Sequence, residues 1–194
     1  MPPQSALPGF GNAEPTDQVF FAILPDDAAG MQASVLSRTL RDTLGLRGRT
    51  LDRERLHVTL LPLGNFPGLP RGLVNEARDA AASVAFPSFR LAFDRVGSFS
   101  GRLGNLPLVL RVGDGLAALG DFQRSLAIAL KRAGLGRHMK SGFVPHMTLL
   151  YDASAVAERP VAPVGWTVRE FVLIHSLLGQ TKHIVLGRWP LREA

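Results

Sequence analysis

Two short elements of the sequence carry side chains that could act together in one reaction. The first element holds His57 and Thr59, the second holds His146 and Thr148, and each threonine is followed by two leucines. The pattern His-x-Thr-Leu-Leu therefore occurs twice, with its histidines 89 positions apart. Residues two apart on a β-strand point to the same face, so each histidine would project beside its threonine. Two such strands beside one cleft would bring both imidazoles and both hydroxyls to one point.

These groups match the requirements for opening a cyclic phosphodiester by in-line attack of water. A base must take a proton from the water, and an acid must protonate the departing oxygen on the opposite side of phosphorus. The ordinary pKa of histidine, ~6.5, allows one imidazole to be neutral while the other is protonated near neutral pH. The threonine hydroxyls can donate hydrogen bonds to the non-bridging phosphate oxygens.

Two other interpretations of these elements stay open at this level. A single His-x-Thr element is commonly structural, since threonine is a frequent strand residue, and the functional interpretation depends on the repetition. Two histidines could also bind a metal ion. At ligand spacing around either element we find only Asp152, six residues beyond His146, so we expect no metal site.

The composition is that of a soluble globular protein with one ordinary domain. The chain has 194 residues, of which 46% are hydrophobic and 20% charged, and no apolar run reaches the ~18 residues that a membrane span needs. Cysteine is absent, which excludes disulfides, thiolate catalysis and cysteine-bound metals. The first residues show no secretory signal, so we expect a cytoplasmic protein without membrane contact.

The formal charge of +6 comes almost entirely from arginine, because Lys131, Lys140 and Lys182 are the only lysines. The planar guanidinium is well suited to phosphate. An Arg-rich and Ala-rich composition is equally expected from codon bias. The charge is therefore compatible with nucleic acid, nucleotides or another phosphorylated substrate, and it does not select one of them.

Strands and helices alternate around the two His-x-Thr elements. Residues 1–17 hold four prolines and no apolar periodicity, which predicts a flexible tail ahead of a single domain over residues 18–194. Apolar runs predict strands at 19–25, 56–64, 89–99, 106–112, 146–152, 166–178 and 183–191, the last two as an antiparallel pair. Helical periodicity predicts a helix capped by Asp26 and Asp27, and further helices at 69–84 and 114–134. The apolar stripe of the first helix is formed by Met31, Val35, Leu36, Leu40 and Leu44. About seven strands and three helices indicate an α+β fold.

Three stretches of the chain resemble the two-histidine (2H) phosphoesterase superfamily. They are RERLHVTLLPLG (53–64), FVPHMTLLYD (143–152) and FVLIHSLLGQTKHIVLGRWPL (171–191). Within the superfamily they are similar to the LigT-like RNA 2′,3′-cyclic phosphodiesterases, also called 2′-5′ RNA ligases. The resemblance extends from about residue 18 to residue 191, and its most specific part is the paired motif with Pro145 before the second histidine.

The resemblance implies a bilobal α+β fold in which two antiparallel sheets, related by pseudo-two-fold symmetry, line a central cleft with helices outside. It also implies a reaction on 2′,3′-cyclic phosphates without metal or cofactor. Carried over by position, the catalytic residues are His57, Thr59, His146 and Thr148. By the same resemblance, His146 is the base that activates water and His57 the acid that protonates the leaving ribose oxygen.

The chain departs from the family pattern at two places. Relatives usually have Phe-Leu-Gly after the first motif, where this chain has Leu61-Pro62-Leu63-Gly64. An aromatic residue is common where this chain has His183, so the way in which a substrate base would be stacked is open at this point.

Three further residues are candidates for substrate binding. Arg55 precedes His57 by two and could reach the phosphate, and Lys140 could neutralise phosphate charge from the loop before the second motif. Phe143 could stack a base or pack under that loop. The histidines without a threonine partner are expected to be structural or solvent-facing; they are His138, His175 and His183.

The expected activity is metal-independent hydrolysis of 2′,3′-cyclic phosphate ends of RNA or nucleotides, together with the reverse 2′-5′ joining reaction, by a monomer without cofactors. Two alternatives remain. The chain could be an RNA-binding module with the same cleft and no turnover, or a phosphodiesterase for a small cyclic phosphate other than RNA. Two intact His-x-Thr elements favour the enzyme over the binding module.

Overall fold

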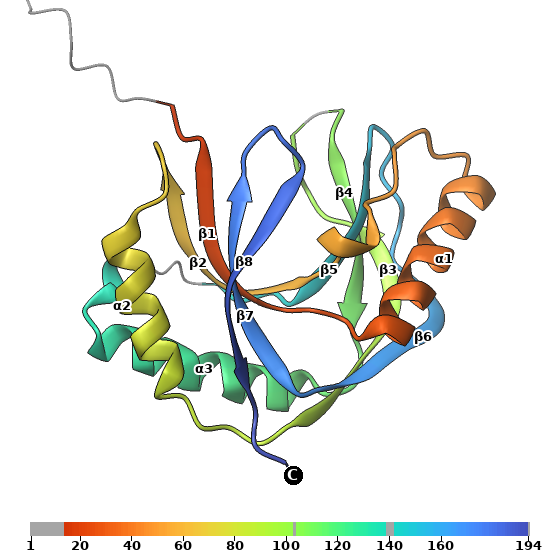
Figure 1. Ribbon diagram of the computed structural model, residues 1–194. Coiled ribbons are helices and arrows are strands. Elements are labelled where there is room, and N and C mark those ends of the chain that lie inside the picture. The colour runs from red at the N-terminus through yellow and green to blue at the C-terminus, as the bar shows by residue number, and fades with distance from the viewer. Residues whose placement is uncertain (1–13, 103, 139–141, 194) are drawn as a thin grey trace, which may run out of the picture.

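The computed structural model describes residues 14–102, 104–138 and 142–193. Its strands are β1 (Asp17–Ile23), β2 (Val58–Phe66), β3 (Phe89–Ser98), β4 (Leu106–Val112), β5 (His146–Asp152), β6 (Arg159–Val168), β7 (Glu170–Leu177) and β8 (Lys182–Pro190). Its helices are α1 (Asp27–Thr43), α2 (Arg71–Ala82) and α3 (Leu116–Arg132), with short 3-10 helices η1 (Arg53–Arg55) and η2 (Leu135–His138). Within these residues the strands form one antiparallel sheet in the order β6-β3-β4-β5-β2-β1-β7-β8, and the helices lie outside it (Figure 1).

The sheet consists of two halves of four strands each. β6, β3, β4 and β5 form one half, and β2, β1, β7 and β8 form the other. In the described ladder, β5 and β2 are joined by one residue pair, Val58 opposite Met147. The predicted α+β fold with outer helices is confirmed, but the two sheets that we expected are continuous through this pair.

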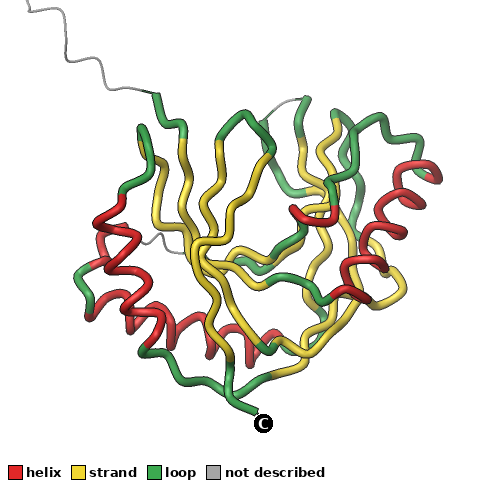
Figure 2. Tube along the Cα trace, viewed as in Figure 1, coloured by secondary structure: helices red, strands yellow, loops and turns green. Residues whose placement is uncertain are grey.

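The helices pack on the strands in two places, α1 in one and α2 with α3 in the other. α1 contacts β5 and β6, α2 contacts β8, and α3 contacts both β2 and β3. Figure 2 shows α1 on one side of the strands and α2 with α3 on the other. No helix in the described part of the chain is long and apolar enough to cross a membrane.

The number of strands differs from the prediction at one place. We predicted a continuous strand over 166–178, whereas the structure divides this stretch into the end of β6 and the whole of β7, with Arg169 between them. β6 pairs with β3 at one edge of the sheet, and β7 pairs with β1 in the other half. The chain must therefore leave one half of the sheet and enter the other, which a single straight strand cannot do.

The two faces of β1 pack in different environments because successive side chains alternate. Phe21 belongs to the main hydrophobic core, where its ring lies 6.1 Å from that of Phe171. Phe20 faces the opposite way and forms a small cluster with Ala22, Val172 and Ile174. This smaller cluster is a second buried apolar layer, on the face of the sheet that lies away from the main core.

β1 begins with a buried carboxylate, at the last residue of the predicted tail. Asp17 accepts hydrogen bonds from the Nε2 of His175, the hydroxyl of Thr16 and, at 3.1 Å, the amide of Gly68. These donors lower the pKa of Asp17, with the Thr16 bond as the largest cause and the His175 bond next. His175 is buried beside it, in the structural role that we expected.

Replacing Asp17 by Asn should lower the midpoint of thermal unfolding at pH 7 by a few degrees, because the charged acceptor of these bonds is lost. The folded-state pKa of Asp17 lies below its unfolded value, so its contribution is complete above that unfolded value and is lost as pH falls through the folded pKa. The difference between the unfolding midpoints of the two proteins should therefore begin to shrink as pH falls below about 4, and should continue to shrink at lower pH. Asp79→Asn, on the exposed side of α2, is the control. A constant difference down to pH 2 would contradict the explanation.

Candidate active site

Both His-x-Thr elements line one cleft of about 340 Å³. The middle residues of the elements, Val58 and Met147, are fully buried and pair with each other at the junction of the two half-sheets. Their neighbours in sequence must then point to the opposite face. The structure accordingly brings all four predicted residues to the wall of this cleft; they are His57, Thr59, His146 and Thr148.

The repeated Leu-Leu after each threonine has a structural cause. Within the described strands, Leu60 is an extra residue in the ladder of β2 with β1, and Leu149 is an extra residue in the ladder of β5 with β4. An extra residue shifts the alternation of a strand by one position. Pro62 and Tyr151, each three residues beyond a threonine, consequently also line the cleft. The two strands thus share a bulge as well as a motif.

The two imidazoles are held in the same way. The Nδ1 of His57 lies 2.7 Å from the carbonyl oxygen of Arg55, and the Nδ1 of His146 lies 2.8 Å from that of Val144. A carbonyl oxygen can only accept a hydrogen bond, so Nδ1 carries a proton in both rings. Each Nε2 therefore remains available to exchange a proton with a substrate.

The surroundings of the two histidines differ. The ring centre of His57 lies 5.1 Å from that of Phe20 and 5.2 Å from that of His183, and its hydrogen bond to Arg55 is partly buried. The ring of His146 lies 4.9 Å from that of Phe99, and its hydrogen bond to Val144 is exposed. His57 thus occupies the more enclosed side of the cleft and His146 the more open side.

Burial is the main electrostatic influence on the enclosed side. It lowers the pKa of His57, and the positive charges of His146 and Arg55 lower it further, against a rise from the bond to the Arg55 carbonyl. Burial, with the charges of His57 and Arg55, lowers the pKa of His183 to about 4. His183 is therefore neutral at neutral pH, and burial favours the neutral form of His57.

His183 is a cleft residue that the sequence did not single out for binding. We expected a structural or solvent-facing side chain, and the structure places it in the wall of the cleft, against both Phe20 and His57. The resemblance did indicate a place in the cleft for this position, because the family commonly has an aromatic residue there. We had selected catalytic histidines by the presence of a threonine two residues later. That criterion cannot identify His183, which reaches the cleft from β8.

The three predicted binding residues have different outcomes. Arg55 lines the cleft and its Nε is buried, but it belongs to η1 and so does not share a strand face with His57. Phe143 packs against the main core and borders a small pocket beside Thr59 and His146. Lys140 lies outside the described residues.

Several polar residues of the cleft were not singled out from the sequence. They come from β1 and from the β7–β8 hairpin and are Gln18, Ser176 and Thr181. Each is an ordinary strand or turn residue in its own segment. Only the pairing of β7 with β1 brings them beside the two histidines.

The carboxylate that could have completed a metal site has other partners. The Oδ2 of Asp152 accepts from the amides of Arg47 and Gly48 at 2.7 and 2.6 Å, and its Oδ1 accepts from the amide of Ser154 at 2.8 Å. These bonds lower its pKa, with the bond from Ser154 as the largest cause. Among the residues described, no three His, Cys, Asp or Glu side chains gather in a way that could hold a metal ion.

Comparison with known proteins gives consistent matches. Residues 25–180 match the 2′-5′ RNA ligase superfamily. The RNA 2′,3′-cyclic phosphodiesterase of Escherichia coli strain K12 is 31% identical over 156 residues, which cover 75% of this chain and 81% of the relative.

Solved structures share the fold. E. coli LigT complexed with 3′-AMP is 26% identical, with a TM-score of 0.69 over 92% of this chain and 99% of that one. TT0787 of Thermus thermophilus has a TM-score of 0.72 over 91% of this chain and 98% of its own, at 19% identity.

Arg55→Gln should raise the pKa of His57, because it removes a positive charge that disfavours the imidazolium. An NMR titration of the histidine ring protons measures this shift directly. Arg53→Gln is a matched control, since its guanidinium is paired with Asp27 at 3.0 Å outside the cleft. An unchanged pKa of His57 in Arg55→Gln would contradict the electrostatic explanation.

Proposed function

Because the chain belongs to the 2′-5′ RNA ligase superfamily, we propose that it opens 2′,3′-cyclic phosphate ends of RNA or nucleotides without a metal ion. The observation that supports this most is the pair of matched imidazoles. His57 and His146 line the same cleft. In each ring, Nδ1 donates a hydrogen bond to a backbone carbonyl, which leaves Nε2 for proton transfer. One base and one acid are what ring opening at phosphorus requires.

The proposed reaction needs two proton transfers. A water oxygen forms a bond to phosphorus while one Nε2 takes the proton of the water. The bond from phosphorus to a ribose oxygen breaks, and the other Nε2 gives its proton to that oxygen, leaving a terminal phosphate monoester. Thr59 and Thr148 donate hydrogen bonds to the non-bridging phosphate oxygens, and the guanidinium of Arg55 offsets the negative charge of these oxygens. If a 5′-hydroxyl replaces the water, the same two transfers join two RNA ends.

We assign the acid to His57 and the base to His146. The leaving oxygen stays on the ribose, so the acid belongs on the side where the nucleoside is enclosed, beside Phe20 and His183. Water reaches the open side, where His146 stands. The lowered pKa of His57 works against its role as acid in the empty cleft, and the bound phosphate anion offsets this by favouring the imidazolium.

The central test is turnover of a short oligonucleotide that ends in a 2′,3′-cyclic phosphate, with excess chelator present. We expect full activity in the chelator and a loss of ~10² or more in kcat/KM for His57→Ala and for His146→Ala. His138→Gln is the control, because His138 lies outside the cleft and should leave the rate unchanged. Binding of the oligonucleotide without any turnover would favour the alternative of an RNA-binding module, and recovery by one particular metal would overturn the metal-free mechanism.

The assignment of acid and base is tested with a phosphodiester whose leaving group is an acidic phenol. Such a group departs without protonation, so this substrate should largely rescue His57→Ala and leave His146→Ala impaired, measured as kcat/KM. Rescue of His146→Ala in place of His57→Ala would reverse the two roles.

A further inference from the structure

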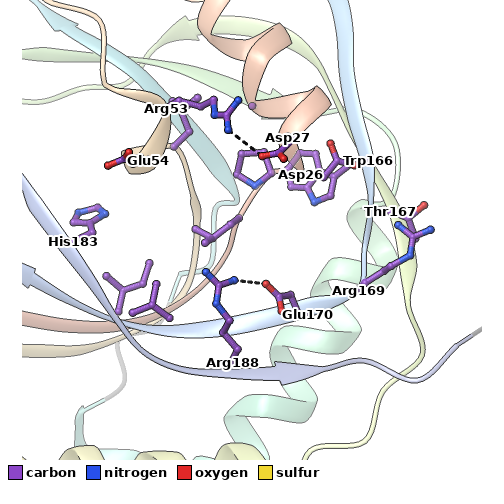
Figure 3. Close-up of a pocket in the computed structure, with 16 residues that line it drawn as sticks. Asp26, Asp27, Arg53, Glu54, Trp166, Thr167, Arg169, Glu170, His183 and Arg188 are labelled. Carbon is purple, nitrogen blue, oxygen red and sulfur yellow. Dashed lines mark hydrogen bonds and ion pairs between the residues drawn. The ribbon is translucent and has the colours of Figure 1, made fainter.

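A second pocket, of about 510 Å³, adjoins the cleft, and His183 lines both. We call it the neighbouring pocket. It lies between the start of α1, η1 and strands β6 to β8, and Figure 3 shows His183 at one end of it. Its volume is within the range of ~300–1,000 Å³ that is typical of small-molecule sites.

The floor of the neighbouring pocket is apolar. Leu24, Ile174 and Val185 line it, and Ile174 belongs to the same small cluster as Phe20. Phe20 in turn lines the cleft, against the rings of His57 and His183. One apolar cluster therefore lies behind both the cleft and the neighbouring pocket.

The charges of the two pockets differ. Among the described residues, the lining of the cleft holds one arginine, Arg55, and no carboxylate. The lining of the neighbouring pocket holds three arginines and four carboxylates. Two of these arginines are paired across its rim, Arg53 with Asp27 and Arg188 with Glu170 (Figure 3). A phosphate is favoured in the cleft, whereas the neighbouring pocket favours a group without net charge.

We propose that the neighbouring pocket binds the nucleoside immediately 5′ to the one that carries the cyclic phosphate, with its base on the apolar floor. A base has an apolar face for such a floor and edges that can bond to a polar rim. This inference rests on the proposed function and makes it more specific. The preferred substrate is then an RNA end of at least two nucleotides, and a free cyclic mononucleotide fills only the cleft.

The first experiment compares three substrates on the unmodified protein, each ending in the same 2′,3′-cyclic nucleotide. One is the mononucleotide, one is a dinucleotide, and one is the dinucleotide without its 5′ base. We expect kcat/KM to be about tenfold or more higher for the dinucleotide than for the mononucleotide, within the ~1–3 kcal/mol that stacking one base contributes. The substrate that lacks the base should lose most of that gain.

The second experiment fills the neighbouring pocket. Val185→Trp should bring kcat/KM for the dinucleotide down to that of the mononucleotide, and should change the rate on the mononucleotide less than about twofold. Ile184→Trp is a matched control, since Ile184 is the adjacent residue of β8, is 37% exposed against 39% for Val185, and does not line the pocket. Circular dichroism establishes that both variants fold.

Three results would overturn the subsite: equal kcat/KM for mononucleotide and dinucleotide, a gain that survives removal of the base, or the same loss in Ile184→Trp as in Val185→Trp. Failure of the proposed function looks different, because none of the substrates would then be opened. In that case calorimetry with mononucleotide and dinucleotide 3′-phosphates still decides the subsite. The subsite requires that the dinucleotide bind about tenfold more tightly than the mononucleotide, and that Val185→Trp abolish this difference. Equal affinities of the unmodified protein for the two ligands would reject the subsite.

Discussion

The backbone pairing of Val58 with Met147 determines where every proposed reacting group lies. Both side chains are fully buried and each is the middle residue of a His-x-Thr element. With these two residues turned into the core, strand alternation turns the flanking histidine and threonine into the cleft from both sides. A shift of the register by one residue would bury the imidazoles and expose the apolar side chains, so core packing and site geometry depend on the same contact.

The bulges at Leu60 and Leu149, just beyond the Val58–Met147 pair, determine which later residues face the cleft. Two successive leucines are buried in each strand because the extra residue reverses the alternation, and the cleft face then resumes at Pro62 and Tyr151. Proline offers no donor there, whereas tyrosine offers both a ring and a hydroxyl. The two strands therefore present different chemistry to the cleft at matching positions, three residues beyond their threonines.

The two sides of the cleft hold matching imidazoles in different surroundings. Both imidazoles have the same Nδ1 anchor, so their difference comes from what surrounds them. His57 lies against Phe20 and the neutral ring of His183, and its pKa is lowered mainly by burial. His146 meets Phe99, over which the Arg111 guanidinium lies at 5.6 Å from the ring centre. The neighbouring pocket opens beside His183, on the β1-β7-β8 side, and gives that side the room for a longer substrate.

Alternation and helical periodicity are local properties of the chain, so the two His-x-Thr elements, their place near strands and the α+β class could be predicted from the sequence. The break at Arg169 and the arrival of His183 in the cleft could not, since they depend on the pairing of strands that are far apart in the sequence, β6 with β3 and β7 with β1. Likewise α1 buries Leu40 of the predicted stripe together with Ala29 and Ala33, and leaves the stripe residues Met31 and Val35 exposed. Which face of a helix is buried depends on what it packs against, here β5 and β6, and only the tertiary structure decides that.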